Sequence, residues 1–172
     1  MLRCAAMRGG TDRAASVELG PYDDAMMRRA LELAQRAAEH LDVPVGAVVF
    51  DSATGRVLGE GFNRREALHD PTAHAEVVAI RAAAEALGDW RLNQCTLVVT
   101  LEPCAMCAGA VVNARLGRLV FGAADPKAGC AGSLMRLTED PRLNHRVLPL
   151  AGVHRQASAE VLKAFFQARR SR

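Results

Sequence analysis

The stretch TLVVTLEPCAMCAGAVVN, residues 96–113, indicates the fold class of this chain. Residues 96–101 form a short apolar run rich in β-branched side chains, which is typical of a buried strand. Pro103 suits the first position of a following helix, because it has no amide hydrogen to leave unsatisfied there. A buried strand that passes into a helix, predicted to end at about residue 113, is the repeating unit of an α/β domain.

The segments around this unit continue the alternation of strand and helix. We expect helices at 23–38, 73–87 and 158–169 and strands at 45–50, 56–62, 118–122 and 145–150. Thr72 is expected to cap the second of these helices, and Gly88 to end it. Parallel strands need crossover helices, and such helices are present, so the order predicts a three-layer α/β/α fold around a mixed sheet of about five strands.

Length and composition fit one folded domain. The chain has 172 residues, of which 50% are hydrophobic and 24% charged, which is too apolar for a disordered protein. Residues 1–22 mix glycine, arginine and small residues without periodicity, so we expect a disordered N-terminal extension there and the domain in residues 23–172. The net charge of +3 neither demands nor excludes a polyanionic partner.

Two further observations concern where the protein works. No run approaches the roughly 18 apolar residues of a membrane span, and the first residues lack the apolar centre of a secretory signal. Five cysteines are an odd number, and Cys104 and Cys107 have the spacing of a metal site rather than of a disulfide. We therefore expect a cytoplasmic protein that makes no membrane contact.

The candidate metal ligands stand at the starts of two predicted helices. His74 lies near the start of one, and Cys104 and Cys107, three residues apart, place both sulfurs on one side of the first turn of the other. The free amides and the positive dipole end of a helix favour thiolates there. One imidazole and two thiolates leave a fourth tetrahedral position for water, as in catalytic zinc sites, so we expect one Zn2+ per subunit.

Glu76 is the candidate proton-transfer group. Zinc lowers the pKa of a bound water, which makes a zinc-bound hydroxide available near neutral pH. Glu76 lies two residues beyond His74, off the face that carries the ligand, and can serve that water as general base and then as general acid.

A closed structural metal site is the alternative to a catalytic one. From the C-x-x-C pair alone, completion of the site by His69, Cys95 or Cys130 is equally open. The added histidine and glutamate, each at the start of a helix, favour the catalytic site.

These residues resemble a known signature. His74-Ala75-Glu76 with Pro103-Cys104-Ala105-Met106-Cys107 is similar to the signature of the zinc nucleobase deaminases of the cytidine deaminase superfamily. The likeness extends to Val43-Pro44-Val45-Gly46-Ala47, Asn63-Arg64, His69-Asp70-Pro71-Thr72, Thr100-Leu101-Glu102 and Gly132-Ser133-Leu134-Met135. Over about residues 25–170 the chain resembles the bacterial tRNA-specific adenosine deaminases. The resemblance implies a cytidine deaminase-like fold, a homodimer, zinc as the only cofactor, and hydrolytic deamination of the wobble adenosine of a tRNA anticodon to inosine.

The resemblance also assigns substrate contacts. Asn63 matches a purine-contacting asparagine, whereas its alternative role is that of a turn residue at a strand end. The residues that match RNA-contacting regions are Asp125, His145, Phe166, Arg169 and Arg170. Stacking on Phe166 or His145, with arginine contacts to phosphate, would suit the single-stranded loop of an anticodon stem-loop. The alternative for the paired phenylalanines is that at least one of them packs in the core.

Two other functions are compatible with these residues. Related enzymes deaminate free bases such as guanine or cytosine, and the metal signature does not separate them from tRNA deaminases. A zinc-stabilised RNA-binding module without catalysis is the third hypothesis, against which the intact Glu76 speaks. Ala124 and Ala164 depart from the family pattern beside residues matched to RNA contacts, so these two departures bear on RNA contact rather than on catalysis. Cys4, Cys95 and Cys130 have no assigned role.

Overall fold

The structure, a computed structural model, describes residues 18–170. Its helices are α1 (Asp23–Glu39), α2 (Arg65–Leu68), α3 (Ala75–Leu87), α4 (Ala105–Asn113) and α5 (Arg155–Arg170), and its strands are β1 (Gly46–Asp51), β2 (Val57–Phe62), β3 (Cys95–Leu101), β4 (Arg118–Ala123) and β5 (Pro149–Ala151). Cys4 and residues 1–17 of the expected N-terminal extension lie outside the described residues, so that extension stays a prediction.

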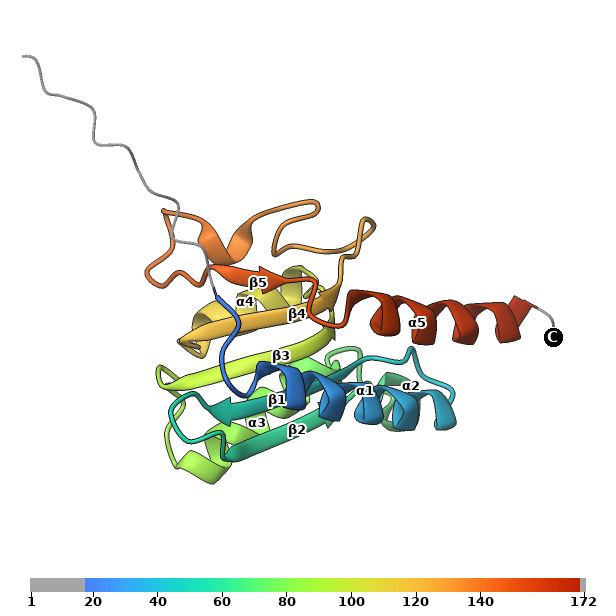
Figure 1. Ribbon diagram of the computed structural model, residues 1–172, viewed down its shortest axis with the longest axis horizontal. Coiled ribbons are helices and arrows are strands. Elements are labelled where there is room, and N and C mark those ends of the chain that lie inside the picture. Colours follow the sequence, from blue (N-terminus) through green and yellow to red (C-terminus); the bar gives the residue numbers. More distant parts are fainter. Residues whose placement is uncertain (1–17, 171–172) are drawn as a thin grey trace, which may run out of the picture.

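The strands form one mixed sheet in the order β2-β1-β3-β4-β5 (Figure 1). β1 runs antiparallel to β2 and β3, whereas β3, β4 and β5 run parallel to one another. The three inner strands are buried almost throughout, because helices cover both faces of the sheet. The expected five-stranded mixed sheet is therefore confirmed.

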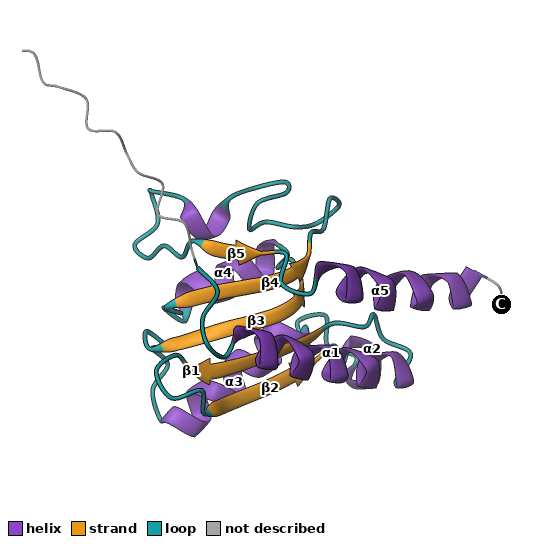
Figure 2. Ribbon diagram, viewed as in Figure 1, coloured by secondary structure: helices purple, strands orange, loops and turns teal. Residues whose placement is uncertain are grey.

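Helices pack on both sides of this sheet. α1 and α5 lie on one face and α3 and α4 on the other, which gives the expected three layers (Figure 2). On the α1 face, Met27 and Leu33 pack with Val48, Phe50 and other sheet residues. No helix within residues 18–170 is both long and apolar enough to cross a membrane.

Two glycines allow α3 to lie unusually close to β2. A Cβ at Gly61 would lie 2.2 Å from the carbonyl oxygen of Ala75, and one at Gly59 would lie 2.3 Å from that of Ala79. Only a residue without a side chain permits this approach. The first turn of α3 is thereby fixed against the hairpin.

The two helices that carry the predicted ligands begin later than expected. α3 starts at Ala75 with His74 in the N-cap position, and α4 starts at Ala105 with Cys104 in that position. The expected cap by Thr72 is wrong, because its hydroxyl donates instead to the carboxylate of Asp70, 2.7 Å away, in a local turn. Gly88 ends α3 in the left-handed conformation, as expected.

Candidate active site

The three predicted metal ligands come together between the starts of α3 and α4. His74 and Cys104 have the extended backbone of N-cap residues, and Cys107 follows in the first turn of α4. Nδ1 of His74 lies 3.8 Å from Sγ of Cys104 and 3.5 Å from Sγ of Cys107. The three ligand atoms all lie within 4.8 Å of one another.

These separations fit a tetrahedral zinc ion. Zinc bonds of about 2.3 Å to sulfur and about 2.0 Å to nitrogen give tetrahedral N–S edges of roughly 3.5 Å, close to the observed values. Among residues 18–170, no fourth histidine, cysteine or carboxylate joins the group. A closed site completed by His69, Cys95 or Cys130 is therefore not assembled in this part of the chain, and the group offers three ligands.

The two thiols of the group differ in their electrostatics. The hydrogen bond with Cys107 and the contact with His74 lower the pKa of Cys104, whereas the same sulfur contact and burial raise the pKa of Cys107. The contact with Cys104 raises the pKa of His74. The group thus retains protons that a divalent ion would displace on binding.

Glu76 lies in the first turn of α3, beside the metal group. Its side chain is buried. Burial raises the pKa of the Glu76 carboxyl group above its ordinary range. A carboxyl group that accepts and releases a proton closer to neutral pH is suited to general acid–base chemistry.

A cavity of about 140 Å³ opens on this group. Its wall includes His74, Glu76 and Cys104 together with Asn63, Arg65, Glu102 and Asp125. Pockets for drug-sized ligands are typically about 300–1,000 Å³, so this one suits a single small group such as one base.

Asn63 lies at the cavity wall but also has a structural role. Its Oδ1 accepts a hydrogen bond from the backbone amide of Ala75 at 2.9 Å, and its Nδ2 donates to the carbonyl oxygen of Val43 at 2.9 Å. One hydrogen on Nδ2 remains available to a substrate. The predicted purine contact and the alternative turn role are therefore compatible in one side chain.

Asp125 also lines the cavity, whereas the other predicted RNA contacts lie elsewhere. Nε2 of His145 lies 2.8 Å from the carbonyl oxygen of Leu116, and His145 does not line the cavity. Phe166, Arg169 and Arg170 lie on the C-terminal half of α5, which extends beyond the ends of the strands (Figure 1). All three are exposed, Phe166 by 45%, so the core alternative does not apply to Phe166.

Glu102 is a buried residue at the site for which no role of its own was predicted. Its carboxylate accepts hydrogen bonds from the backbone amides of Asp125, Ala131 and Ser133 at 3.0, 3.1 and 2.8 Å, and from the hydroxyl of Ser133. Burial alone would raise the pKa of Glu102, but these hydrogen bonds outweigh it and hold the pKa below its ordinary value. Two signals in the sequence pointed to it: Glu102 directly follows a buried strand, and it belongs to the Thr100-Leu101-Glu102 match.

Asp42 and Arg65 form a second arrangement that the sequence did not predict. The fully buried carboxylate of Asp42 accepts from Nη2 of Arg65 at 3.2 Å and from the backbone amides of Val43 and Glu66 at 2.8 and 3.0 Å. Burial would raise the pKa of Asp42, but these donors together lower it. The pair ties the start of α2, and with it Arg65, to the cavity wall.

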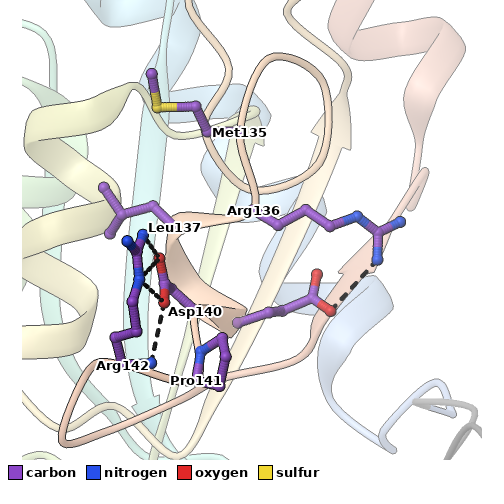
Figure 3. Close-up of a pocket in the computed structure, with 7 residues that line it drawn as sticks. Met135, Arg136, Leu137, Asp140, Pro141 and Arg142 are labelled. Atoms are coloured by element: carbon purple, nitrogen blue, oxygen red, sulfur yellow. Dashed lines mark hydrogen bonds and ion pairs between the residues drawn. The ribbon is translucent and has the colours of Figure 1, made fainter.

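Larger hollows occur away from this group. One of about 690 Å³ is lined by residues 135–137 and 139–142, and none of the metal group lines it (Figure 3). Its charged side chains are paired with one another, Arg142 with Asp140 at 2.6 Å and Arg136 with Glu139 at 3.5 Å. The hydrogen bond from Arg142 lowers the pKa of Asp140 to about 2. Size alone therefore does not identify the active site.

Comparison with known proteins places this arrangement in a family. The family described as MafB19-like deaminase matches residues 22–170. A tRNA-specific adenosine deaminase from Haemophilus influenzae is 46% identical over 149 residues, which are 87% of this chain and 86% of that protein.

Two solved structures extend the comparison. One comes from studies of A-to-I editing by tRNA:A34 deaminases at the wobble position of transfer RNA; it is 45% identical, with a TM-score of 0.76, and the match covers 80% of this chain and 99% of that one. A guanine deaminase from Bacillus subtilis is 38% identical, with a TM-score of 0.57, over 64% of this chain and 69% of that one. The chain therefore belongs to the MafB19-like deaminases and to the family of the tRNA-specific adenosine deaminases.

Proposed function

We propose that this protein hydrolytically deaminates the wobble adenosine of a tRNA anticodon to inosine. The observation that carries the proposal is a buried carboxyl group, Glu76, beside a three-ligand metal group at the wall of a base-sized cavity. Membership of the tRNA-specific adenosine deaminase family supports adenosine in tRNA as the substrate.

His74, Cys104 and Cys107 would hold one zinc ion, since their spacing and chemistry fit that metal. Zinc, when bound, would lower the pKa of a coordinated water and so supply the nucleophile. Glu76 would take a proton from the attacking water and deliver it to the adenine ring nitrogen as the C6–O bond forms. It would then move the proton of the C6 hydroxyl to the exocyclic amino group, so that the C6–N bond breaks, ammonia leaves and the C6 carbonyl of inosine forms. The burial that raises the pKa of Glu76 suits it to both transfers.

The remaining wall would orient the base. The free Nδ2 hydrogen of Asn63 and the backbone amide of Cys104 are the proposed donors to the purine. Asp125 lines the same cavity and would contact the nucleotide there.

Contacts outside the cavity would favour tRNA over a free base. Exposed Phe166 offers a stacking surface, and exposed Arg169 and Arg170 would meet phosphates of the anticodon stem-loop. His145 is proposed as a further RNA contact, although its ring bonds to the backbone of Leu116. We also propose that the enzyme acts as a homodimer, as the family resemblance implies, and in the cytoplasm, as its cysteine usage indicates.

Guanine is the second candidate substrate. It is favoured by the likeness to the guanine deaminase and by a cavity that would admit a free base as readily as a flipped one. The two are separated by incubating the zinc-loaded protein with a tRNA that carries adenosine at the wobble position and, in parallel, with guanine. Inosine at that position, read by sequencing, supports the proposal. Ammonia release from guanine with unmodified tRNA would replace the proposal by guanine deamination. If neither inosine nor ammonia is formed, the result would favour the non-catalytic RNA-binding module.

A further inference from the structure

Glu102 carries a buried negative charge with an unusual set of partners. It is 2% exposed, and none of the lysines, arginines or histidines in residues 18–170 forms an ion pair with it. A buried carboxylate is costly unless donors compensate it. Every donor that compensates this one belongs to a single segment, residues 125–133, which we term the wall loop.

Gly129 shows that the wall loop is shaped to fit this carboxylate. A Cβ at Gly129 would lie 2.3 Å from Cδ and 2.4 Å from Oε2 of Glu102. The absence of a side chain therefore lets the loop backbone close directly over the carboxyl group. The loop approaches Glu102 through its hydrogen bonds at both ends and through this contact in the middle.

The wall loop is also joined to the segment that bears a metal ligand. The backbone amide of Cys130 donates to the carbonyl oxygen of Pro103 at 2.8 Å, and Cys104 and Gly129 form an isolated antiparallel bridge. Within the loop, Asp125 and Ala128 line the cavity, as does Glu102 itself. The position of the loop on Glu102 thus determines the shape of one side of the cavity.

We propose that Glu102 is a positioning residue that holds the wall loop as one side of the cavity and thereby sets how tightly the enzyme holds the reacting base. The proposal rests on the deaminase function proposed above. Glu102 acts through the loop, whereas the metal ligands are positioned by the starts of α3 and α4. Of these ligands, Cys104 also bridges the wall loop, at Gly129. Loss of Glu102 should weaken substrate binding without removing zinc.

Glu102→Gln is the principal test, because glutamine has the same shape but one acceptor oxygen, and its amide nitrogen would face N–H donors. Gly129→Ala disturbs the same contact from the loop side. Glu60→Gln is the matched control. Glu60 lies on β2, pairs with Arg29 of α1 and does not line the cavity. Zinc content, hydrogen exchange and steady-state kinetics with a wobble-adenosine tRNA are measured for each variant.

In Glu102→Gln and Gly129→Ala we expect the amides of Asp125, Ala131 and Ser133 to exchange at least roughly tenfold faster than in wild type. The KM for tRNA should rise at least roughly tenfold, while zinc content stays at the wild-type level and kcat per bound zinc changes by less than about threefold, which is the pattern expected when uniform binding is weakened. A role confined to overall stability would lower Tm without this separation of KM from kcat.

Unchanged exchange of the three amides in Glu102→Gln would overturn the proposal, as would loss of zinc or a KM equal to that of Glu60→Gln. If wild-type protein forms no inosine, the proposed function fails instead. The exchange measurement needs no substrate and still decides whether Glu102 holds the wall loop.

Discussion

Replacement of Asn63 by alanine should destabilise the protein, whatever its effect on substrate. The change removes the acceptor for the backbone amide of Ala75, which is buried, and the donor to the carbonyl oxygen of Val43, which is partly buried. An unsatisfied buried group costs about 1–3 kcal/mol, so we expect a loss of about 3 kcal/mol in the free energy of unfolding. For a domain of this size that corresponds to a fall in Tm of roughly 6–12 °C.

The assay is thermal unfolding of metal-free and zinc-loaded protein. Asn113→Ala is the control, because Asn113 is exposed at the end of α4 and its replacement should change stability by less than about 0.5 kcal/mol. The metal-free measurement separates the effect of the missing hydrogen bonds from any loss of zinc. A difference of less than about 2 °C between the Tm values of Asn63→Ala and Asn113→Ala would refute the structural role assigned to Asn63. Such a difference corresponds to a free-energy change well below the one expected.

Four further results are expected. Glu76→Gln should retain zinc but lose about 10²–10⁴-fold in kcat, because it removes proton transfer and not a ligand; metal analysis showing zinc loss would contradict this division of roles. Removal of zinc by a chelator should abolish activity and lower Tm, and added Zn2+ should restore both; a Tm indifferent to chelation would argue against the metal group. Asp42→Asn should destabilise the protein near neutral pH. Because folding lowers the pKa of Asp42, its stabilisation is present above the unfolded pKa of about 3.9 and is lost as pH falls through the folded value, so urea titrations should show wild type and variant converging below about pH 4. Alanine at Arg169 and Arg170 should weaken tRNA binding and make its salt dependence shallower, by about one unit of log–log slope for each phosphate that is no longer neutralised; an unchanged slope would exclude a phosphate-binding role for these arginines.

Much of this site could be predicted because its chemistry is local along the chain. Cys104 and Cys107 share one helical turn, so their spacing alone brings the sulfurs together. His74 and Glu76 lie only two residues apart, so the sequence alone places them in the same part of the site, with His74 as the N-cap of α3 and Glu76 in its first turn. The central strands were equally clear, since strands buried on both faces give continuous apolar runs.

The helix starts were predicted wrongly because their partners are remote or compete locally. The hydroxyl of Thr72 donates to the carboxylate of Asp70, and the backbone amide of Ala75 donates to Oδ1 of Asn63, twelve residues earlier in the chain. No pattern within the helix itself reports such a partner.

The alternation of strands and helices, and the kind of ion that His74, Cys104 and Cys107 suit, could be inferred from the order of residues alone, because side-chain chemistry and spacing along one backbone are local properties. The surroundings of that group became known only from the folded chain. The donors to Glu102 and Asp42 are largely backbone amides, which every residue but proline possesses and no sequence motif distinguishes. Their convergence on a buried carboxylate depends on how distant segments meet in space, and so does the shape of the cavity beside Glu76.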